Sequence, residues 1–311
     1  MEKIATRISY GNALNELVKI RPDLFVLDAD VSCATMTNIF QKANPERHFN
    51  CGIQECNMLG VAAGIASTGN LVFASAFAMF AAGRAYEIAR NSIGYPKLNV
   101  KIGATHAGIS VGEDGASHQC CEDIALMRTI PGMTIINPAD DIEAKAAVLA
   151  MADYEGPAYL RFGRLPVLVF NNPDTYKFEV GKGITLRDGG DITIIATGLL
   201  VYPAIEAAEE LAKDGINARV INIHTIKPLD EELVLKAACE TGAIVVAEEH
   251  SVIGGLGSAV AELTAEKHLA HVVKLGINDT YGYSGPAVQL LEEFGLTAGG
   301  IIEKVKFVLN K

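Results

Sequence analysis

Residues 192–197 (ITIIAT), 218–223 (ARVINI) and 243–248 (AIVVAE) decide the fold class. Each is a short apolar run rich in β-branched residues, which is typical of a strand buried on both faces. Helical stretches separate the runs, at about residues 201–214 and 230–241. Strands that alternate with helices predict mostly parallel sheets with helices on both faces. The sequence therefore indicates the α/β class.

The alternation continues on both sides of this stretch. The further predicted strands are 24–28 (LFVLD), 100–104 (VKIGA), 133–137 (MTIIN) and 271–275 (HVVKL), and the further predicted helices are 86–92, 140–154, 257–267 and 286–294. Residues 166–190 interrupt the rhythm with Pro, Asn-Asn-Pro-Asp and Asp-Gly-Gly, which are loop signals. We therefore expect two domains, residues 1–167 and 191–311, joined by a linker at 168–190. Each should be a mostly parallel sheet with helices on both faces.

Composition excludes several classes of protein. The chain has 311 residues, of which 50% are hydrophobic and 20% charged, so general disorder is excluded and two α/β domains account for the length. The net charge of −11 argues against nucleic-acid binding, which depends on basic residues that neutralise phosphates. The negative net charge does not exclude binding of small anionic ligands, because a local cluster of cations can oppose it.

One stretch is long enough to cross a membrane, because no charged residue occurs from Cys56 to Gly83. The turn signal STGN at residues 67–70 lies in its middle. We therefore expect a helix, a turn and a buried strand of a soluble core, and no transmembrane segment.

The cysteines show no CxxC pair or other zinc spacing, and residues 1–10 contain no secretory signal. Reduced thiols in the cytoplasm are the expectation. A functional vicinal disulfide at Cys120–Cys121 is the minor alternative.

A polar loop follows the predicted strand 100–104. Residues 105–119 read THAGISVGEDGASHQ and combine three glycines with His106, His118, Glu113 and Asp114. Glycines let a ligand approach the backbone, and α/β sheets bind ligands at loops after the carboxyl ends of strands. Our first interpretation is a ligand-binding loop. A solvated polar loop is the second, and a metal site at the two histidines is the third.

Other residues also have two interpretations. Glu55 is the last charge before the uncharged span, so it is either a helix-start carboxylate, which is favoured when it is taken alone, or a buried acid with a raised pKa. Phe77 and Phe80 are core aromatics by default. The glycines in GGLG at residues 254–257 lack the third position of a dinucleotide fingerprint, so we expect tight strand–helix packing there.

Several motifs together resemble transketolase. Gly-Ile-Gln-Glu at 52–55, Ser-Ala-Phe-Ala-Met-Phe at 75–80 and Gly-Glu-Asp-Gly-Ala-Ser-His-Gln at 112–119 match, in order, the pyrimidine-binding domain of thiamine-diphosphate enzymes. Asn-Ile-His-Thr-Ile-Lys-Pro at 222–228 and Ala-Glu-Glu-His-Ser-Val-Ile-Gly-Gly-Leu-Gly-Ser at 247–258 are similar to the transketolase C-terminal domain. The resemblance covers nearly the whole chain.

The resemblance implies roles for residues near the cofactor. Glu55 corresponds to the glutamate that bonds the aminopyrimidine ring nitrogen and acts in acid–base catalysis through the cofactor. Phe77 and Phe80 would stack on or enclose the pyrimidine, with Tyr86 as an unassigned further aromatic. Asp30 resembles an acid that lies near this glutamate at a subunit contact.

The resemblance also implies the substrate-binding residues. Asp114 and His118 resemble the pair that contacts sugar hydroxyls and assists proton transfer, so His118 joins Glu55 as a catalytic candidate. Arg7, His106 and Arg164 occupy the positions of phosphate ligands, and the planar guanidinium of arginine suits phosphate.

The chain departs from transketolase in two places. The serine expected shortly after Asp30 is displaced, with Ser32 and Thr35 flanking Ala34. Moreover, the Gly-Asp-Gly motif of the metal and diphosphate site of a full-length transketolase does not occur. The chain thus resembles the C-terminal subunit of a split transketolase, whose separate N-terminal subunit supplies that site.

These features predict a thiamine-diphosphate-dependent transferase that moves a two-carbon ketol unit from a ketose phosphate to an aldose phosphate, as in the pentose phosphate pathway. We expect activity only with the N-terminal subunit, in an α2β2 complex whose Mg²⁺ ligands lie on that partner. The alternatives are the C-terminal portion of 1-deoxyxylulose-5-phosphate synthase, which shares Gly-Glu-Asp-Gly-x-x-His-Gln, and a non-catalytic transketolase-like binding subunit. His224 and His250 receive no catalytic role.

Overall fold

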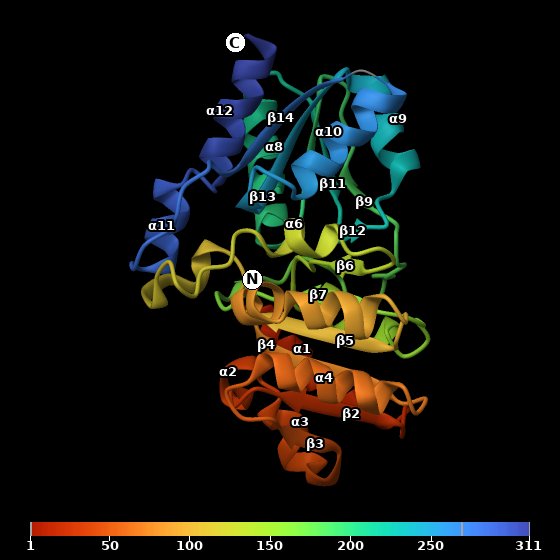
Figure 1. The fold of residues 1–311 in the computed structure, drawn as a ribbon. Helices are drawn as coiled ribbons and strands as arrows, with labels where there is room; N and C mark the ends of the chain where they lie inside the picture. The colour runs from red at the N-terminus through yellow and green to blue at the C-terminus, as the bar shows by residue number, and fades with distance from the viewer. Residues whose placement is uncertain (1, 269, 311) are drawn as a thin grey trace.

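Two mostly parallel sheets, one from each half of the chain, organise the structure (Figure 1). The computed structural model describes residues 2–268 and 270–310. Helices cover both sheets, so the predicted α/β class is confirmed. No helix in the described part of the chain is long and apolar enough to cross a membrane.

The first sheet has seven strands among the described residues. Their spatial order is β12 (Thr225–Lys227), β6 (Thr134–Ile136), β7 (Ala158–Arg161), β5 (Val100–Thr105), β4 (Leu71–Phe77), β2 (Leu24–Asp28) and β3 (His48–Asn50). Every neighbouring pair is parallel except β12 and β6. The carboxyl ends of β2 to β5 and of β7 therefore meet at one edge of the sheet, which we call the carboxyl edge.

The long uncharged stretch builds the centre of this domain. It forms α4 (Glu55–Ala66), a turn and the strand β4, as predicted. Ser67 and Thr68 close the turn by donating side-chain hydrogen bonds to the carbonyls of Gly64 and Ile65. The first six residues of β4 are buried, which accounts for their apolar character.

The second sheet has five strands within the described ranges. Their order is β14 (His271–Ile277), β13 (Ala243–Ser251), β10 (Ile192–Ala196), β11 (Ala218–Asn222) and β9 (Ile184–Arg187). All pairs are parallel except β9 and β11. The predicted strands at 192–197, 218–223, 243–248 and 271–275 are thus confirmed, with ends that differ by up to three residues.

One short strand crosses between the halves of the chain, and another joins the two ends of the first half. β12 follows β11 in sequence but pairs with β6 at the end of the first sheet. β8 (Val167–Leu168) pairs with β1 (Lys3–Ile4), which lies at the start of the chain. Residues 184–187, within the segment expected to be a linker, form β9. The two halves are therefore joined by the pairing of β12 with β6 as well as by the covalent chain.

The helices and helical turns complete the layers. They are α1 (Thr6–Leu17), α2 (Ser32–Thr35), α3 (Asn38–Ala43), η1 (Pro45–Arg47), η2 (Met79–Arg84), α5 (Tyr86–Ile88), η3 (Ala89–Gly94), η4 (Ile109–Asp114), α6 (Asp123–Arg128), α7 (Asp141–Ala150), η5 (Gly198–Leu200), α8 (Val201–Lys213), α9 (Glu231–Thr241), α10 (Leu256–Lys267), α11 (Ala287–Glu293) and α12 (Ala298–Leu309). The helix predicted at 86–92 is only partly α-helical, because π-helical turns flank α5. Such wide turns occur frequently at functional sites.

Candidate active site

The carboxyl edge of the first sheet gathers residues that are far apart in sequence. Asp30 follows β2, Glu55 follows β3, Phe77 ends β4, His106 follows β5 and Arg164 follows β7. Because these strands are parallel neighbours, their ends lie at the same edge. The topology thus explains why the sequence-predicted residues occupy one region.

Glu55 is a buried carboxylate with one cationic neighbour. It begins α4, and its residue surface is only 4% exposed. Its Oε2 lies 3.2 Å from Nη1 of Arg84, whose own side chain is 55% exposed. The Arg84 guanidinium also lies 5.0 Å from the ring centre of Phe80. Glu55 therefore starts a helix, and its carboxylate is also buried.

Two phenylalanines and two histidines form an aromatic cluster next to this pair. Phe77 stacks on His106 with a centroid distance of 4.0 Å, and on Phe80 at 6.3 Å. His118 meets Phe80 edge to face, with centroids 5.3 Å apart. Phe77, Phe80 and His118 are half-buried, whereas residues deep in the core are fully buried. These rings are therefore available to a ligand.

The loop between β5 and α6 brings its polar residues to the same region. His106 has a left-handed backbone with φ of 56°, and Thr105 hydrogen-bonds its Nδ1 at 2.9 Å. His118 Nδ1 lies 3.0 Å from the hydroxyl of Ser117. Asp114 is exposed and lies 4.0 Å from Arg164.

Arg7 and Arg164 lie beside this loop near His106, and we call these three residues the cationic corner because of the two arginines. Burial and the nearby Arg164 guanidinium lower the pKa of Arg7. Burial, with Arg7 and Arg164 as further causes, lowers the pKa of His106 to about 3, so its imidazole is neutral at pH 7. Arg164 pairs with the exposed Glu113 at 3.1 Å. A cavity of about 330 Å³ is lined by Arg7, Arg164, Ser110 and Glu113.

Asp30 lies at the surface, shortly after the end of β2. It is exposed, it has φ of 66°, and its Oδ1 accepts a hydrogen bond of 2.8 Å from Asn50. Its backbone N–H donates to Asp28, which is fully buried and lies 2.7 Å from Nε2 of His48. These contacts fix the chain directly after β2 and β3.

Several polar residues of this region were missed by sequence reasoning. The Asp28–His48 pair was not predicted, because its members are twenty residues apart and belong to no local motif. Arg84 was not singled out either. A signal was present for it, since Arg84 is the first charge after the uncharged span that Glu55 precedes.

Two other sequence candidates, Tyr86 and His224, lie away from the aromatic cluster. The hydroxyl of Tyr86 hydrogen-bonds Thr129 at 2.7 Å and has no contact with the aromatic cluster among the described interactions. Thr35, one of the two hydroxyl residues near the expected serine position, is buried, and its hydroxyl donates a hydrogen bond to the carbonyl of Val31. Arg7 of the cationic corner donates to the carbonyl of Ala34 at 2.6 Å. His224 is buried against Phe178, and burial lowers its pKa to about 4.

The glycines at residues 254–257 pack tightly, as predicted. A Cβ at Gly255 would overlap the carboxylate of Glu248, and one at Gly257 would press on Lys274. Glu248 instead accepts hydrogen bonds from the N–H groups of Leu256 and Gly257, at 2.7 and 2.8 Å. This junction therefore anchors the start of α10.

Two family sequence models match the chain. One, described as the transketolase pyrimidine-binding domain, matches residues 2–167, and the other, described as the transketolase C-terminal domain, matches residues 181–301. The chain belongs to the transketolase family. Its members are transferase-type enzymes.

Relatives of this transketolase chain include separate subunits. A protein named as a transketolase C-terminal section, from Methanocaldococcus jannaschii, is 50% identical over 98% of this chain and 96% of its own length. A 6-deoxy-6-sulfo-D-fructose transketolase subunit from Clostridium sp. strain MSTE9 is 41% identical over 100% and 96%. Human transketolase is 34% identical, and the match spans 50% of its length.

Solved transketolase structures have the same fold. A split-gene transketolase described as an inactive β4 tetramer is 53% identical, with a TM-score of 0.92 over 99% of both chains. Transketolase from Campylobacter jejuni superposes with a TM-score of 0.85 over 100% of this chain and 47% of its own. At 24% identity, the second comparison shows the fold alone.

Membership of the transketolase family implies dependence on thiamine diphosphate. The carboxyl edge fits the aminopyrimidine ring of this cofactor. Glu55 offers a buried carboxylate that can accept hydrogen bonds, and Phe77 and Phe80 offer half-buried aromatic surface. Residues 2–268 and 270–310 contain no cluster of three or more His, Cys, Asp or Glu that could hold a metal ion.

Proposed function

We propose that this chain is the pyrimidine-binding and C-terminal subunit of a split transketolase. The complete enzyme transfers a two-carbon ketol unit from a ketose phosphate to an aldose phosphate. The observation that carries the proposal is the Glu55–Arg84–Phe80 arrangement at the carboxyl edge, in a chain that matches half the length of human transketolase.

Glu55 would act on the cofactor's pyrimidine. When bound, thiamine diphosphate supplies a carbon nucleophile and an electron sink for breaking and forming carbon–carbon bonds. The carboxylate of Glu55 holds a proton at the pyrimidine ring nitrogen and so sets the protonation state of that ring. Because the carboxylate is buried while its partner Arg84 is half-exposed, its charge is only partly compensated. Phe77 and Phe80 hold the pyrimidine by stacking.

The cationic corner would bind the phosphate of the sugar. Arg7 and Arg164 present guanidinium groups, and His106 is neutral and able to donate a hydrogen bond. Asp114 and His118, on the loop between this corner and the aromatic cluster, would bind sugar hydroxyls, and His118 would assist proton transfer. Asp30 would contact the neighbouring subunit near Glu55.

A partner subunit would complete the site. Such a partner would hold the diphosphate group and the Mg²⁺ ion, in an α2β2 complex located in the cytoplasm. Two features support this: the matched relatives include separately encoded subunits, and the related split-gene transketolase tetramer is described as inactive.

Reconstitution tests the proposal directly. The chain is co-purified with its partner from the native cell and assayed with thiamine diphosphate and Mg²⁺. One assay uses xylulose and ribose phosphates, a second uses pyruvate and glyceraldehyde phosphate, and a third offers 6-deoxy-6-sulfofructose as donor. We expect turnover with a ketose donor in the complex and none with this chain alone.

Two results would contradict the proposal. Turnover with pyruvate in place of a ketose would assign the chain to 1-deoxyxylulose-5-phosphate synthesis. Full activity of this chain without a partner would exclude the split-subunit arrangement. Preference for the sulfosugar over the phosphosugar would retain ketol transfer and change the substrate class.

A further inference from the structure

The loop that carries His106, Asp114 and His118 has little regular structure of its own. We call residues 106–118 the substrate loop. Gly108, Gly112 and Gly115 all have φ between 76° and 81°, and only the short turn η4 lies among them. A loop with this many glycines loses much conformational entropy on ordering, so its shape must be stabilised from outside.

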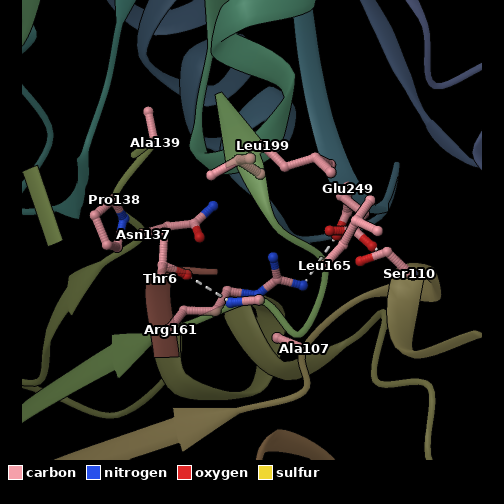
Figure 2. Close-up of a pocket in the computed structure, with 12 residues that line it drawn as sticks. Thr6, Ala107, Ser110, Asn137, Pro138, Ala139, Arg161, Leu165, Leu199 and Glu249 are labelled. Carbon is pink, nitrogen blue, oxygen red and sulfur yellow. Dashed lines mark hydrogen bonds between the residues drawn. The ribbon is translucent and has the colours of Figure 1, made fainter. Parts of the chain in front are cut away.

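Glu249, from the second half of the chain, contacts this loop through its carboxylate. It lies in β13 and is 5% exposed. Its Oε1 accepts a 2.7 Å hydrogen bond from the backbone N–H of Ser110 (Figure 2). A Cβ at Gly108 would overlap the Glu249 carboxylate, so the glycine permits this close approach. The glutamate therefore fits the loop closely.

The backbone of Glu249 is itself held in place. Arg161 donates a 2.9 Å hydrogen bond to the carbonyl of Glu249 and pairs with the buried Asp123 at 2.8 Å. Burial raises the pKa of the Glu249 carboxyl, although Arg161 opposes that shift. Glu249 lies where the pairing of β13 with β14 is irregular, between Ala247 and Ser251, so its backbone is held there by Arg161.

The segment before α11 also holds the substrate loop, through Gln119. Gln119 donates to the carbonyls of Ile109 and Gly112 inside the loop, at 3.2 and 3.3 Å, and to that of Tyr283 at 3.0 Å. The helix α11 lies beside η4 (Figure 1). Two elements of the second half of the chain, β13 and the segment leading into α11, therefore contact the substrate loop.

We infer that Glu249 is a positioning residue for substrate, which acts by fixing the substrate loop through the Ser110 N–H. This inference rests on the proposed function and gives the second half of the chain a part in it. Glu249 does not line the aromatic cluster, so it acts through the placement of His106, Asp114 and His118.

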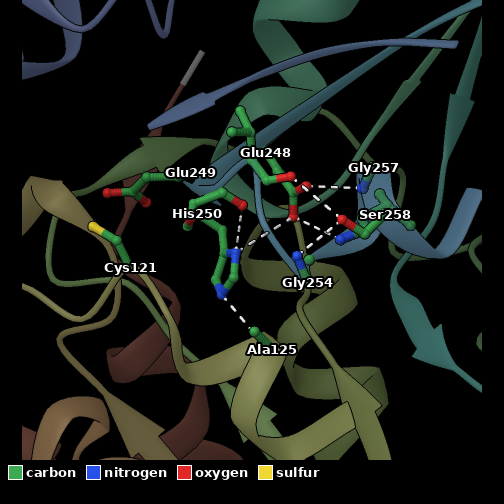
Figure 3. A network of polar contacts seen from close by, with 12 residues as sticks. Cys121, Ala125, Glu248, Glu249, His250, Gly254, Gly257 and Ser258 are labelled. Carbon is green, nitrogen blue, oxygen red and sulfur yellow. Dashed lines mark hydrogen bonds and ion pairs between the residues drawn. The ribbon is translucent and has the colours of Figure 1, made fainter. Parts of the chain in front are cut away.

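Glu248 provides a matched control. It is the adjacent residue of β13, it is 1% exposed, and it also accepts backbone hydrogen bonds. Its partners belong to α10, and its side chain extends away from that of Glu249 (Figure 3). Glu248→Ala therefore removes a similar buried carboxylate without touching the substrate loop.

The experiment compares Glu249→Ala, Glu249→Gln and Glu248→Ala. Hydrogen exchange of the Ser110 amide is measured in the full chain, and kcat and KM for ribose phosphate are measured in the reconstituted complex. Glu249→Ala should speed Ser110 exchange and raise KM by about tenfold each, the range of a lost charge-assisted hydrogen bond. Glu249→Gln keeps an acceptor oxygen and should stay within about threefold of wild type. Glu248→Ala should lower thermal stability and leave KM unchanged.

The outcomes separate this inference from the proposed function. Wild-type exchange and KM in Glu249→Ala would overturn the inference, and so would an equal rise in KM in Glu248→Ala. A wild-type complex that transfers no ketol unit would refute the proposed function, while Ser110 exchange would still decide the positioning role. If Glu249→Ala does not fold, Ser110→Pro removes the same hydrogen bond from the loop side and should raise KM similarly.

Discussion

Two buried carboxylates in this chain each pair with an arginine, and the two pairs differ in their surroundings. Asp123 and Arg161 are 0% and 4% exposed at the side chain, and Asp123 also accepts a hydrogen bond from Tyr159. Glu55 is similarly buried, yet its partner Arg84 is 55% exposed and makes one contact of 3.2 Å. Asp123 and Arg161 are both buried and satisfy each other within the chain. The Glu55 carboxylate, by contrast, keeps oxygen lone pairs that can accept further hydrogen bonds. Free capacity at a buried carboxylate is what a ligand or a partner subunit can use.

The largest expected effect is on the Glu55–Arg84 pair. Glu55→Ala should lower turnover of the reconstituted complex by about 100-fold or more, the range for loss of an acid–base group. The free energy of unfolding should change by no more than about 1 kcal/mol, because an ion pair with an exposed arginine contributes little. Steady-state kinetics and urea denaturation of the same preparation measure both quantities.

Glu46→Ala is the control for this comparison. Glu46 lies in η1, its side chain is 69% exposed, and its nearest cation, Arg47, is 3.9 Å away. The control should match wild type in both turnover and stability. Normal turnover in Glu55→Ala would remove Glu55 from the mechanism and leave it as a helix-start residue only.

The Asp123–Arg161 pair should respond in the opposite way, with its main effect on the free energy of unfolding. Burial alone would raise the pKa of Asp123, but Arg161 and His250 hold it below its ordinary value, so the carboxylate is ionised. Asp123→Ala leaves the buried Arg161 without its counter-ion and should reduce the free energy of unfolding by about 3–5 kcal/mol. Urea denaturation of the chain alone measures this. A loss below about 1 kcal/mol would mean that the pair is not structural.

The difference between the two pairs also explains what the sequence could predict. Strands such as 192–197 and 218–223 were predicted because burial on both faces leaves a local apolar run. Phe77, His106 and His118 were expected at one site only through the resemblance of their motifs to transketolase, and the structure brings their rings together. β12 was not expected in the first sheet, because its partner β6 is remote in sequence and pairing leaves no local signal.

Long-range polar contacts were beyond sequence reasoning for the same reason. Glu55 and Arg84 are 29 residues apart, and Glu249 reaches Ser110 across 139 residues. Local periodicity reports which face of an element is buried, but it carries no information about which distant polar group meets a buried carboxylate. Only the folded topology brings these partners together.

A third buried carboxylate, Glu143, extends the comparison because it has no cationic partner among its described contacts. It accepts hydrogen bonds from Tyr176, from Asn222 at 2.8 Å and from the N–H of Ala139 at 2.6 Å, and so joins α7 to the second half of the chain. Burial raises its pKa from 4.5 to about 7, with the nearby Asp140 as a further cause. This carboxyl should therefore make stability depend on pH.

The smallest expected effect follows from the sign of that shift. A carboxyl whose pKa is higher in the folded state contributes stability that is fully present below pH 4.5 and is lost as pH rises toward 7. Glu143→Gln stays neutral, so its stability relative to wild type should rise across this window by at most about 1.4 kcal/mol per pH unit. Urea denaturation of both proteins between pH 4.5 and 8 measures the difference, and Glu46→Gln serves as the exposed control. Parallel stability curves for wild type and Glu143→Gln would mean that Glu143 is ionised in the folded protein, with its three hydrogen bonds compensating the charge as an arginine does for Asp123.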